Sequence, residues 1–193
     1  RLVDYVGDTA VALAYVTSAT AENSYVGVSG VWGDCTMAAT PGILPGGYRS
    51  VADMTVAADA TLTMADGAHM TLAGGSLKIK GALKANNSQV ADLITTSSSS
   101  RDVILEKNAL LEVVNANILV DDTYGNIDVA AGARFSMTGG TLSTYAYLEG
   151  VAGSTIALNG VNVVSGPVNA LGNLDAKGST FAENVLCGQR AKL

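Results

Sequence analysis

Charged residues are scarce in this sequence, and basic ones are scarcer than acidic ones. Lys and Arg together number 11 against 17 Asp and Glu, which gives a net charge of -6 and a charged fraction of 15%. Nucleic acids and anionic membranes attract basic patches, so we expect neither as a partner. The longest apolar run, from Ala10 to Val16, is far shorter than the roughly 20 residues that cross a bilayer, so we expect no membrane insertion.

The residues and motifs of enzymes are also scarce. His69 is the only histidine, and no nucleophile elbow, phosphate-binding loop or dinucleotide fingerprint occurs. We therefore expect no enzyme, no cofactor and no histidine-based metal site. The one tight acidic group is Asp121, Asp122 and Asp128, in a loop with a glycine turn. These carboxylates are candidate calcium ligands, but their spacing does not follow the EF-hand order, and a solvated acidic turn is the favoured interpretation.

Cysteine is limited to Cys35 and Cys187, which lie near opposite ends of the sequence without CxxC spacing. This arrangement argues against a metal site. The remaining interpretations are two buried small hydrophobes, or a disulfide that staples the ends of the chain or links two molecules, and we favour a disulfide. The first residue is Arg1 rather than Met, which is the pattern of a processed N-terminus, so we expect an extracellular or cell-surface location.

What the sequence has in abundance is a short repeat of a turn, alternating apolar residues and glycine. The segment 67–77 returns as 132–142 and, in weaker form, as 153–163, while 108–118 and 178–181 fit the same frame. The starts at 67, 108, 132, 153 and 178 differ by 41, 24, 21 and 25. The unit is therefore about 22 residues, with one weak copy inside the longest step, and such a period predicts a solenoid.

Within each unit, apolar residues alternate at i and i+2 for a few residues and then meet a glycine turn, which is typical of short strands. Three strands per unit predict an all-β fold, a single-stranded parallel β-helix. His69 is expected to point outward, in line with Arg134 and Thr155. The alignment predicts two inward columns and one turn position that needs positive φ. The first column holds Met70, Leu111, Phe135 and Ile156; the second holds Leu72, Val113, Met137 and Leu158; the turn position holds Gly74, Asn115, Gly139 and Gly160.

The amino-acid sequence of the segments Val56–Leu62 and Gly75–Ala85 resembles that of secreted right-handed β-helix proteins of bacterial and phage surfaces, such as adhesins and autotransporter passengers. The resemblance covers about residues 50 to 180 and rests on architecture rather than on a functional motif. It implies a right-handed solenoid. Because related folds include filament subunits, tail spikes and polysaccharide lyases, the resemblance does not choose a function.

Residues 1–48 depart from the repeat, and we divide the chain into an N-terminal β segment, 1–48, and a β-helix, 49–193. A solenoid must cover its exposed end strands. The N-terminal segment is therefore interpreted either as a cap for its own chain or as an assembly segment that pairs with a neighbour. The assembly candidates are the apolar and aromatic residues of its two expected strands: Val11, Leu13, Tyr15, Tyr25, Val28 and Trp32.

The function that these features favour is structural. Low charge, the missing catalytic motifs and the aromatic N-terminal segment predict an extracellular subunit of a surface filament or matrix fibre, with other copies of itself as partner. The alternative is a carbohydrate-binding adhesin or phage spike segment, which would use a long lateral face.

Overall fold

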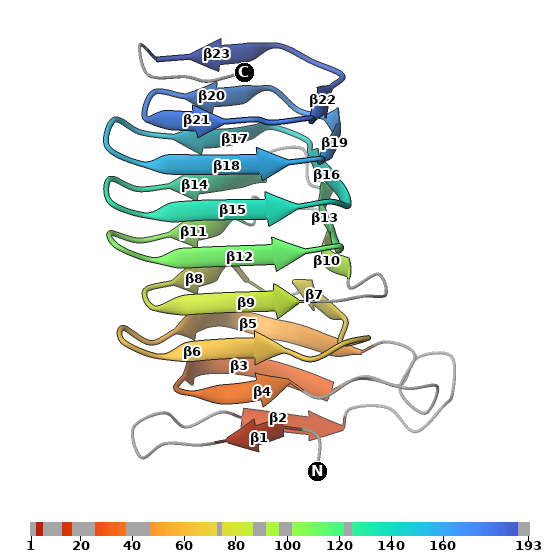
Figure 1. Cartoon of the computed structure of the whole chain (residues 1–193). Helices are drawn as coiled ribbons and strands as arrows, with labels where there is room; N and C mark the ends of the chain where they lie inside the picture. The colour runs from red at the N-terminus through yellow and green to blue at the C-terminus, as the bar shows by residue number, and fades with distance from the viewer. Residues whose placement is uncertain are drawn as a thin grey trace.

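In the computed structural model the chain is built from β-strands. The structure describes residues 3–5, 13–16, 26–37, 47–72, 75–86, 92–96, 102–121 and 125–188. The strands form a right-handed parallel β-helix in which stacked strands lie roughly 23 residues apart in the sequence, as Figure 1 shows, and this confirms the predicted fold class. Among the described residues, no helix has the length and apolar character needed to span a membrane.

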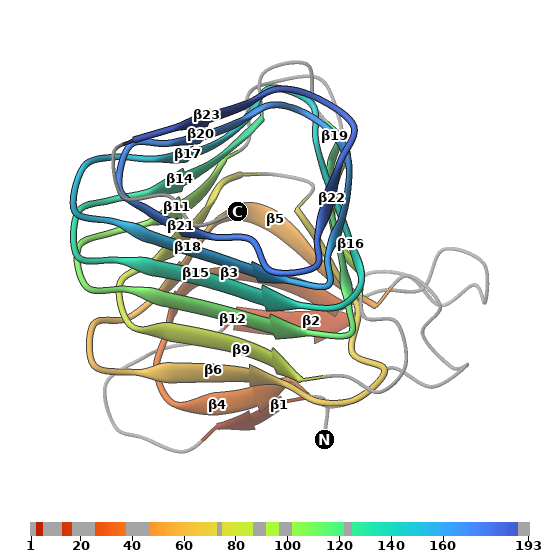
Figure 2. The same cartoon turned by 45° about the horizontal axis from the view of Figure 1, so that its top comes forward.

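Three faces run along the stack, and Figure 2 shows them obliquely from the C-terminal end. Face A consists of β1 (Val3–Tyr5), β4 (Cys35–Met37), β6 (Thr61–Met64), β9 (Ala82–Asn86), β12 (Leu110–Val114), β15 (Arg134–Thr138), β18 (Thr155–Asn159) and β21 (Asn173–Asp175). Face B includes β7 (Met70–Leu72), β10 (Asp92–Thr96), β13 (Asn117–Asp121), β16 (Thr141–Thr144), β19 (Asn162–Ser165) and β22 (Thr180–Phe181). Face C includes β8 (Leu77–Ile79), β11 (Val103–Leu105), β14 (Asn126–Val129), β17 (Tyr147–Gly150), β20 (Val168–Ala170) and β23 (Val185–Cys187).

Two long strands join faces B and C near the N-terminal end. The first part of β5 (Tyr48–Val56) pairs with β7 and its last part pairs with β8. In the preceding coil, β3 (Val26–Trp32) pairs in parallel with β5, and β4 pairs in parallel with β6. The parallel stack therefore includes residues on the N-terminal side of the boundary expected between residues 48 and 49.

The core is a stack of inward side chains, since residues alternate between the interior and the outer surface along each strand. Leu111, Phe135 and Ile156 are paired in register on face A and are fully buried, as predicted. Met70 was wrongly placed in this column, because it lies on face B, where it pairs with Tyr48. The inward column of face A consists of Cys35, Leu62, Leu83, Leu111, Phe135, Ile156 and Leu174.

The second predicted column contains the same kind of error. Val113, Met137 and Leu158 are in register on face A, whereas Leu72 lies on face B and pairs with Ser50. His69 is likewise not in line with Arg134 and Thr155, which pair with each other on face A. It immediately precedes β7, and its Nε2 lies 3.4 Å from Thr71 Oγ1. The strand β7 therefore belongs to a different face from the one that the alignment gave it.

The predicted turn position is confirmed where the structure describes it. Asn115, Gly139 and Gly160 have φ values of 51°, 65° and 63°, and each follows a face A strand where the chain turns toward face B. Backbone hydrogen bonds connect these turns between coils, with Gly139 N donating to Asn159 O at 2.8 Å. Gly74, the fourth expected member, lies outside the described residues.

Candidate functional site

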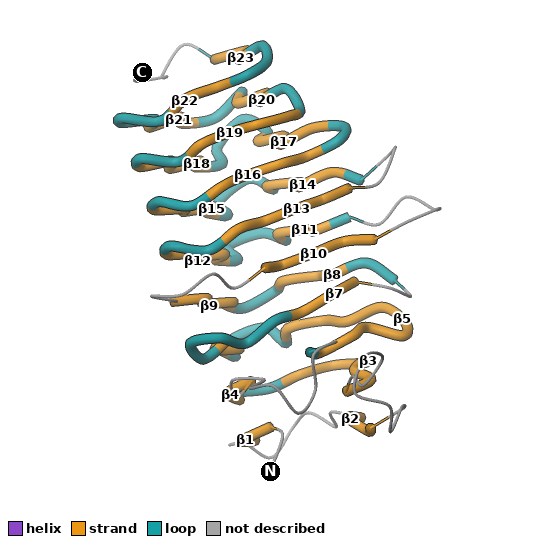
Figure 3. The backbone as a smooth tube through the Cα atoms, turned by 90° about the vertical axis from the view of Figure 1, so that its right-hand side faces the viewer, coloured by secondary structure: helices purple, strands orange, loops and turns teal. Residues whose placement is uncertain are grey.

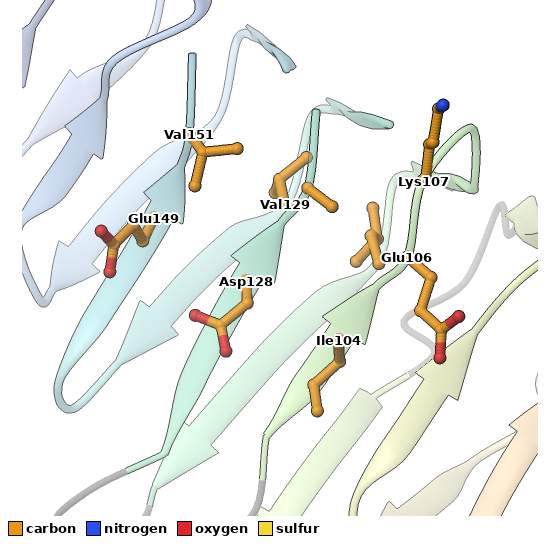
Figure 4. A pocket seen from close by; sticks show the side chains of 9 residues that line it. Ile104, Glu106, Lys107, Asp128, Val129, Glu149 and Val151 are labelled. Atoms are coloured by element: carbon orange, nitrogen blue, oxygen red, sulfur yellow. The ribbon is translucent and has the colours of Figure 1, made fainter. Parts of the chain in front are cut away.

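The outer surface of face C carries a groove across three neighbouring coils. Parallel pairing places Ile104 of β11, Asp128 of β14 and Glu149 of β17 in one outward row. The inward residues that flank this row, among them Ile127 and Leu148, are fully buried and fix the strands beneath it. Figure 4 shows the two carboxylates side by side on adjacent strands. Adjacent strands are about 4.8 Å apart, so Asp128 and Glu149 are close enough to interact directly.

Apolar side chains make up much of the groove, whose volume is about 500 Å³. Ile104 continues the row beside Asp128, and Val151 lies two residues beyond Glu149 along the chain, on the same outer surface (Figure 4). The lining residues are Ile104, Leu105, Glu106, Lys107, Asp128, Val129, Ala130, Glu149 and Val151. The surface therefore combines two carboxylates with methyl and methylene groups.

The surroundings of Asp128 disfavour the charged form of its carboxyl group. Burial raises its pKa to about 6, and the neighbouring charges of Asp102 and Glu149 act in the same direction. Among the described residues, none forms a hydrogen bond or ion pair with the side-chain carboxylate of Asp128 or Glu149. By contrast, Lys78 Nζ lies 2.8 Å from Asp53 Oδ2, and this contact lowers the pKa of the Asp53 carboxyl. The carboxylates of the groove lack that compensation within the described chain.

We predict that Asp128→Asn stabilises the protein at neutral pH. The raised pKa means that Asp128 costs least below its unfolded value of about 4 and that the cost appears as the pH rises through about 6. Because the side chain is only half-buried, we expect a gain of about 1 kcal/mol at pH 7 after solvent screening. Urea unfolding at pH 4 and pH 7 measures this difference. An advantage of the variant that is larger at pH 4 than at pH 7 would contradict it.

The three calcium candidates are only partly described. Asp128 lies in the groove, Asp121 ends β13 and Asp122 lies outside the described residues. Among the residues that the structure describes, no group of three or more His, Cys, Asp or Glu is arranged to hold a metal ion.

The assembly candidates fall into three groups. Val28 and Trp32 of β3 are fully buried in their own chain, where Trp32 Nε1 donates to Ser29 O at 3.1 Å. Neither side chain is available to a neighbour. Leu13 and Tyr15 belong to β2 (Leu13–Val16), which pairs antiparallel with β3. Val11 and Tyr25 lie outside the described residues.

The N-terminal strands cover the first parallel coil within the chain. The strand β2 pairs antiparallel with β3, and β1 pairs antiparallel with β4. This leaves β1 as the last strand of face A at the N-terminal end and β21 as the last at the C-terminal end. Figure 3 shows β1 and β23 at opposite ends of the stack.

A disulfide within the chain is excluded by this arrangement. Cys35 and Cys187 are free thiols, and Cys35 lies in β4 while Cys187 lies in β23. Between their coils lie the strands β6, β9, β12, β15 and β18 of face A. Coils stacked at about 4.8 Å place the two residues several times farther apart than the roughly 7 Å limit between bridged Cα atoms. The form of the expected disulfide that staples the two ends of the chain is wrong, because the ends of a solenoid do not meet. A disulfide between two molecules stays a prediction. Burial raises the pKa of the Cys35 thiol to about 12, so Cys187 is the more reactive.

The last described coil is less well covered than the coils beneath it. Val163, Val168 and Ala170 are at most 2% exposed. Their partners in the next coil are Phe181, Val185 and Cys187, which point toward the core but are only partly buried. Within the described residues, β21, β22 and β23 have strand partners on one side only. This surface offers both apolar side chains and unpaired strand edges.

Comparisons with known proteins add no relative: no family model, curated protein or solved structure matches the chain.

Sequence reasoning found Asp128 but missed its neighbour Glu149. The two residues are separated by 21 positions, which is one of the steps of the repeat. The repeat itself is therefore the signal that pairs them, because residues one step apart lie side by side on neighbouring coils.

Proposed function

We propose that this chain is an extracellular structural module, a subunit of a surface filament or matrix fibre that associates end to end through its coils. The observation that carries the proposal is the last described coil, where Phe181, Val185 and Cys187 are only partly buried. Backbone groups on an open strand edge gain hydrogen bonds when another strand is added. A second copy offers such a strand, because β1 is the outermost strand of face A at the opposite end.

A contact between two different ends does not close on itself. The last coil of one copy and the N-terminal strands of the next form a heterologous interface, and repetition of such an interface produces a linear assembly when the rotation does not close a ring. This head-to-tail addition continues face A from β21 of one copy to β1 of the next. Pairing of β1 and β2 within their own chain is compatible with it, because within the described residues each has a strand partner on one side only.

We predict that Val185→Lys prevents this association. The ammonium group would lie at the centre of the interface, where it would lose its hydration without gaining a partner. Sedimentation velocity over a range of concentrations, with negative-stain microscopy, should show linear particles for residues 1–193 and monomers for the variant. Val164→Lys is the matched control, because Val164 is 41% exposed on the lateral surface of β19. A monomeric wild-type chain at high concentration, or equal loss in both variants, would contradict the proposal.

Carbohydrate binding stays the alternative. Tyr145 and Tyr147 favour it, since they are 59% and 44% exposed just before and at the start of β17, the strand that carries Glu149. Exposed tyrosine rings beside carboxylates suit sugars, which present both apolar and hydroxyl surfaces.

A further inference from the structure

We propose that the groove on face C binds lysine or arginine side chains of an extended protein segment. This binding site is separate from the coil ends of the proposed assembly, and it does not depend on that assembly. Its two defining features are the apolar lining and the adjacent carboxylates of Asp128 and Glu149.

The charges of the groove require a cation that the described chain does not supply. Asp102 precedes β11, Glu106 and Lys107 follow it, and Asp128 and Glu149 lie on the next two strands. Glu106 is already near Lys80, with a separation of 3.8 Å. The ammonium group of Lys107 points away from Asp128 and Glu149 in Figure 4. The charges of Asp102 and Glu149 therefore both act on the carboxylate of Asp128, and an incoming cation would relieve this repulsion.

The apolar lining selects the kind of cation. Lysine and arginine have methylene stems that pack along apolar surfaces while their charged groups remain at a polar site. In the groove, Ile104 lies beside Asp128, and Val151 lies two residues beyond Glu149 along the chain. A stem that lies on either residue carries its ammonium or guanidinium group to Asp128 and Glu149, where it can form charge-assisted hydrogen bonds. A small metal ion would leave the apolar surface unused.

An extended segment matches the direction of the groove, which crosses the strands β11, β14 and β17. Its residues rise by about 3.3 Å each, so alternate side chains on one side of the segment are about 6.6 Å apart. Neighbouring coils are about 4.8 Å apart, and the difference from this spacing is smaller than the length of a lysine side chain, so two such side chains can reach the carboxylates of neighbouring coils. The partner is consequently a segment with basic residues at alternate positions rather than a single amine.

Binding of a capped pentapeptide with lysines at its second and fourth positions, between valines, tests the proposal. Calorimetry and NMR titration of the full chain should show saturable binding, with shifts confined to β11, β14 and β17. The norleucine counterpart of the peptide should not bind. The double variant Asp128→Asn with Glu149→Gln should weaken binding roughly tenfold or more, because charge-assisted hydrogen bonds are lost. Binding should also weaken as the pH falls through about 6, where Asp128 takes up a proton.

The matched control removes two charges from a different face. Glu112→Gln with Asp175→Asn changes two outward residues of face A and leaves the same net charge as the groove variant. Equal weakening by both double variants would mean that the peptide is attracted by the net negative charge alone, and this would overturn the proposal. Binding of calcium alone, or of an uncharged oligosaccharide, at the same strands without binding of the lysine peptide would also overturn it. Circular dichroism of all variants confirms that the β-helix is retained.

Discussion

Replacement of Phe135 by alanine is expected to cost about 3 to 5 kcal/mol of unfolding free energy. Phe135 is fully buried on β15 and is stacked between Leu111 and Ile156 of the neighbouring coils. Each coil of a solenoid contacts only the coils on either side. Only those few neighbours can relax into the cavity, so most of the lost packing is not recovered. Thermal unfolding followed by circular dichroism should show a melting temperature lower by roughly 10 °C.

The same substitution at Phe181 provides the control, since these are the two phenylalanines of the chain. Phe181 is only partly buried in the last described coil, so its replacement should cost clearly less. Equal losses at both positions, or an unchanged transition for Phe135→Ala, would refute the central position of Phe135 in the core.

Replacement of Gly140 by alanine should be comparably damaging, for a backbone reason. Gly140 has a φ of 78°, a conformation that costs an L-residue about 1 to 2 kcal/mol. An added Cβ would also meet the carbonyl oxygen and carbon of Ala116, which belong to the backbone of the preceding coil. This backbone is held by strand pairing, so it cannot move aside easily. Overpacking should therefore add about 1 to 3 kcal/mol to the conformational cost. Urea unfolding of the variant measures the sum.

Gly160→Ala separates the two contributions. Gly160 has a similar φ of 63°, but a Cβ there would meet nothing within 4 Å. Its replacement should therefore show the conformational cost alone, and Gly160→Asn should cost less still, because Asn115 adopts positive φ at the equivalent turn. If Gly140→Ala is no worse than Gly160→Ala, close contact between the coils does not limit this turn.

The sequence was sufficient to predict the strands and their stacking, but not which face each strand occupies. Gly67-Ala68-His69-Met70 reads like Gly132-Ala133-Arg134-Phe135. The first turn leads from face A to face B, whereas the second leads from face C to face A. Both corners have a glycine turn followed by an inward apolar residue, so a local match cannot distinguish them. Only the position of a turn within its coil can distinguish the corners. That position is hard to count in the sequence, because the length of a coil varies from 28 residues between Leu83 and Leu111 to 18 between Ile156 and Leu174.

The N-terminal coil was missed for a related reason. In β3 and β5 one continuous strand crosses from face B to face C, so no break between two short strands marks this corner. Without that mark, the residues from Val26 to Trp32 read as an ordinary long strand, and Trp32 as an aromatic residue available for assembly. Its burial follows from the coil that closes above it, which no local pattern records.

The alignment of the hydrogen bonds has a mechanical meaning. Neighbouring coils are joined by parallel ladders on three faces, so these bonds point along the length of the rod. Tension between the two ends of the chain would peel strands off one after another instead of shearing a whole sheet at once. At the C-terminal end of the described residues, peeling begins at the coil of Phe181 and Val185, whose side chains are only partly buried. The rod is therefore stiff against bending across its faces, yet it has a defined end from which it unravels under load.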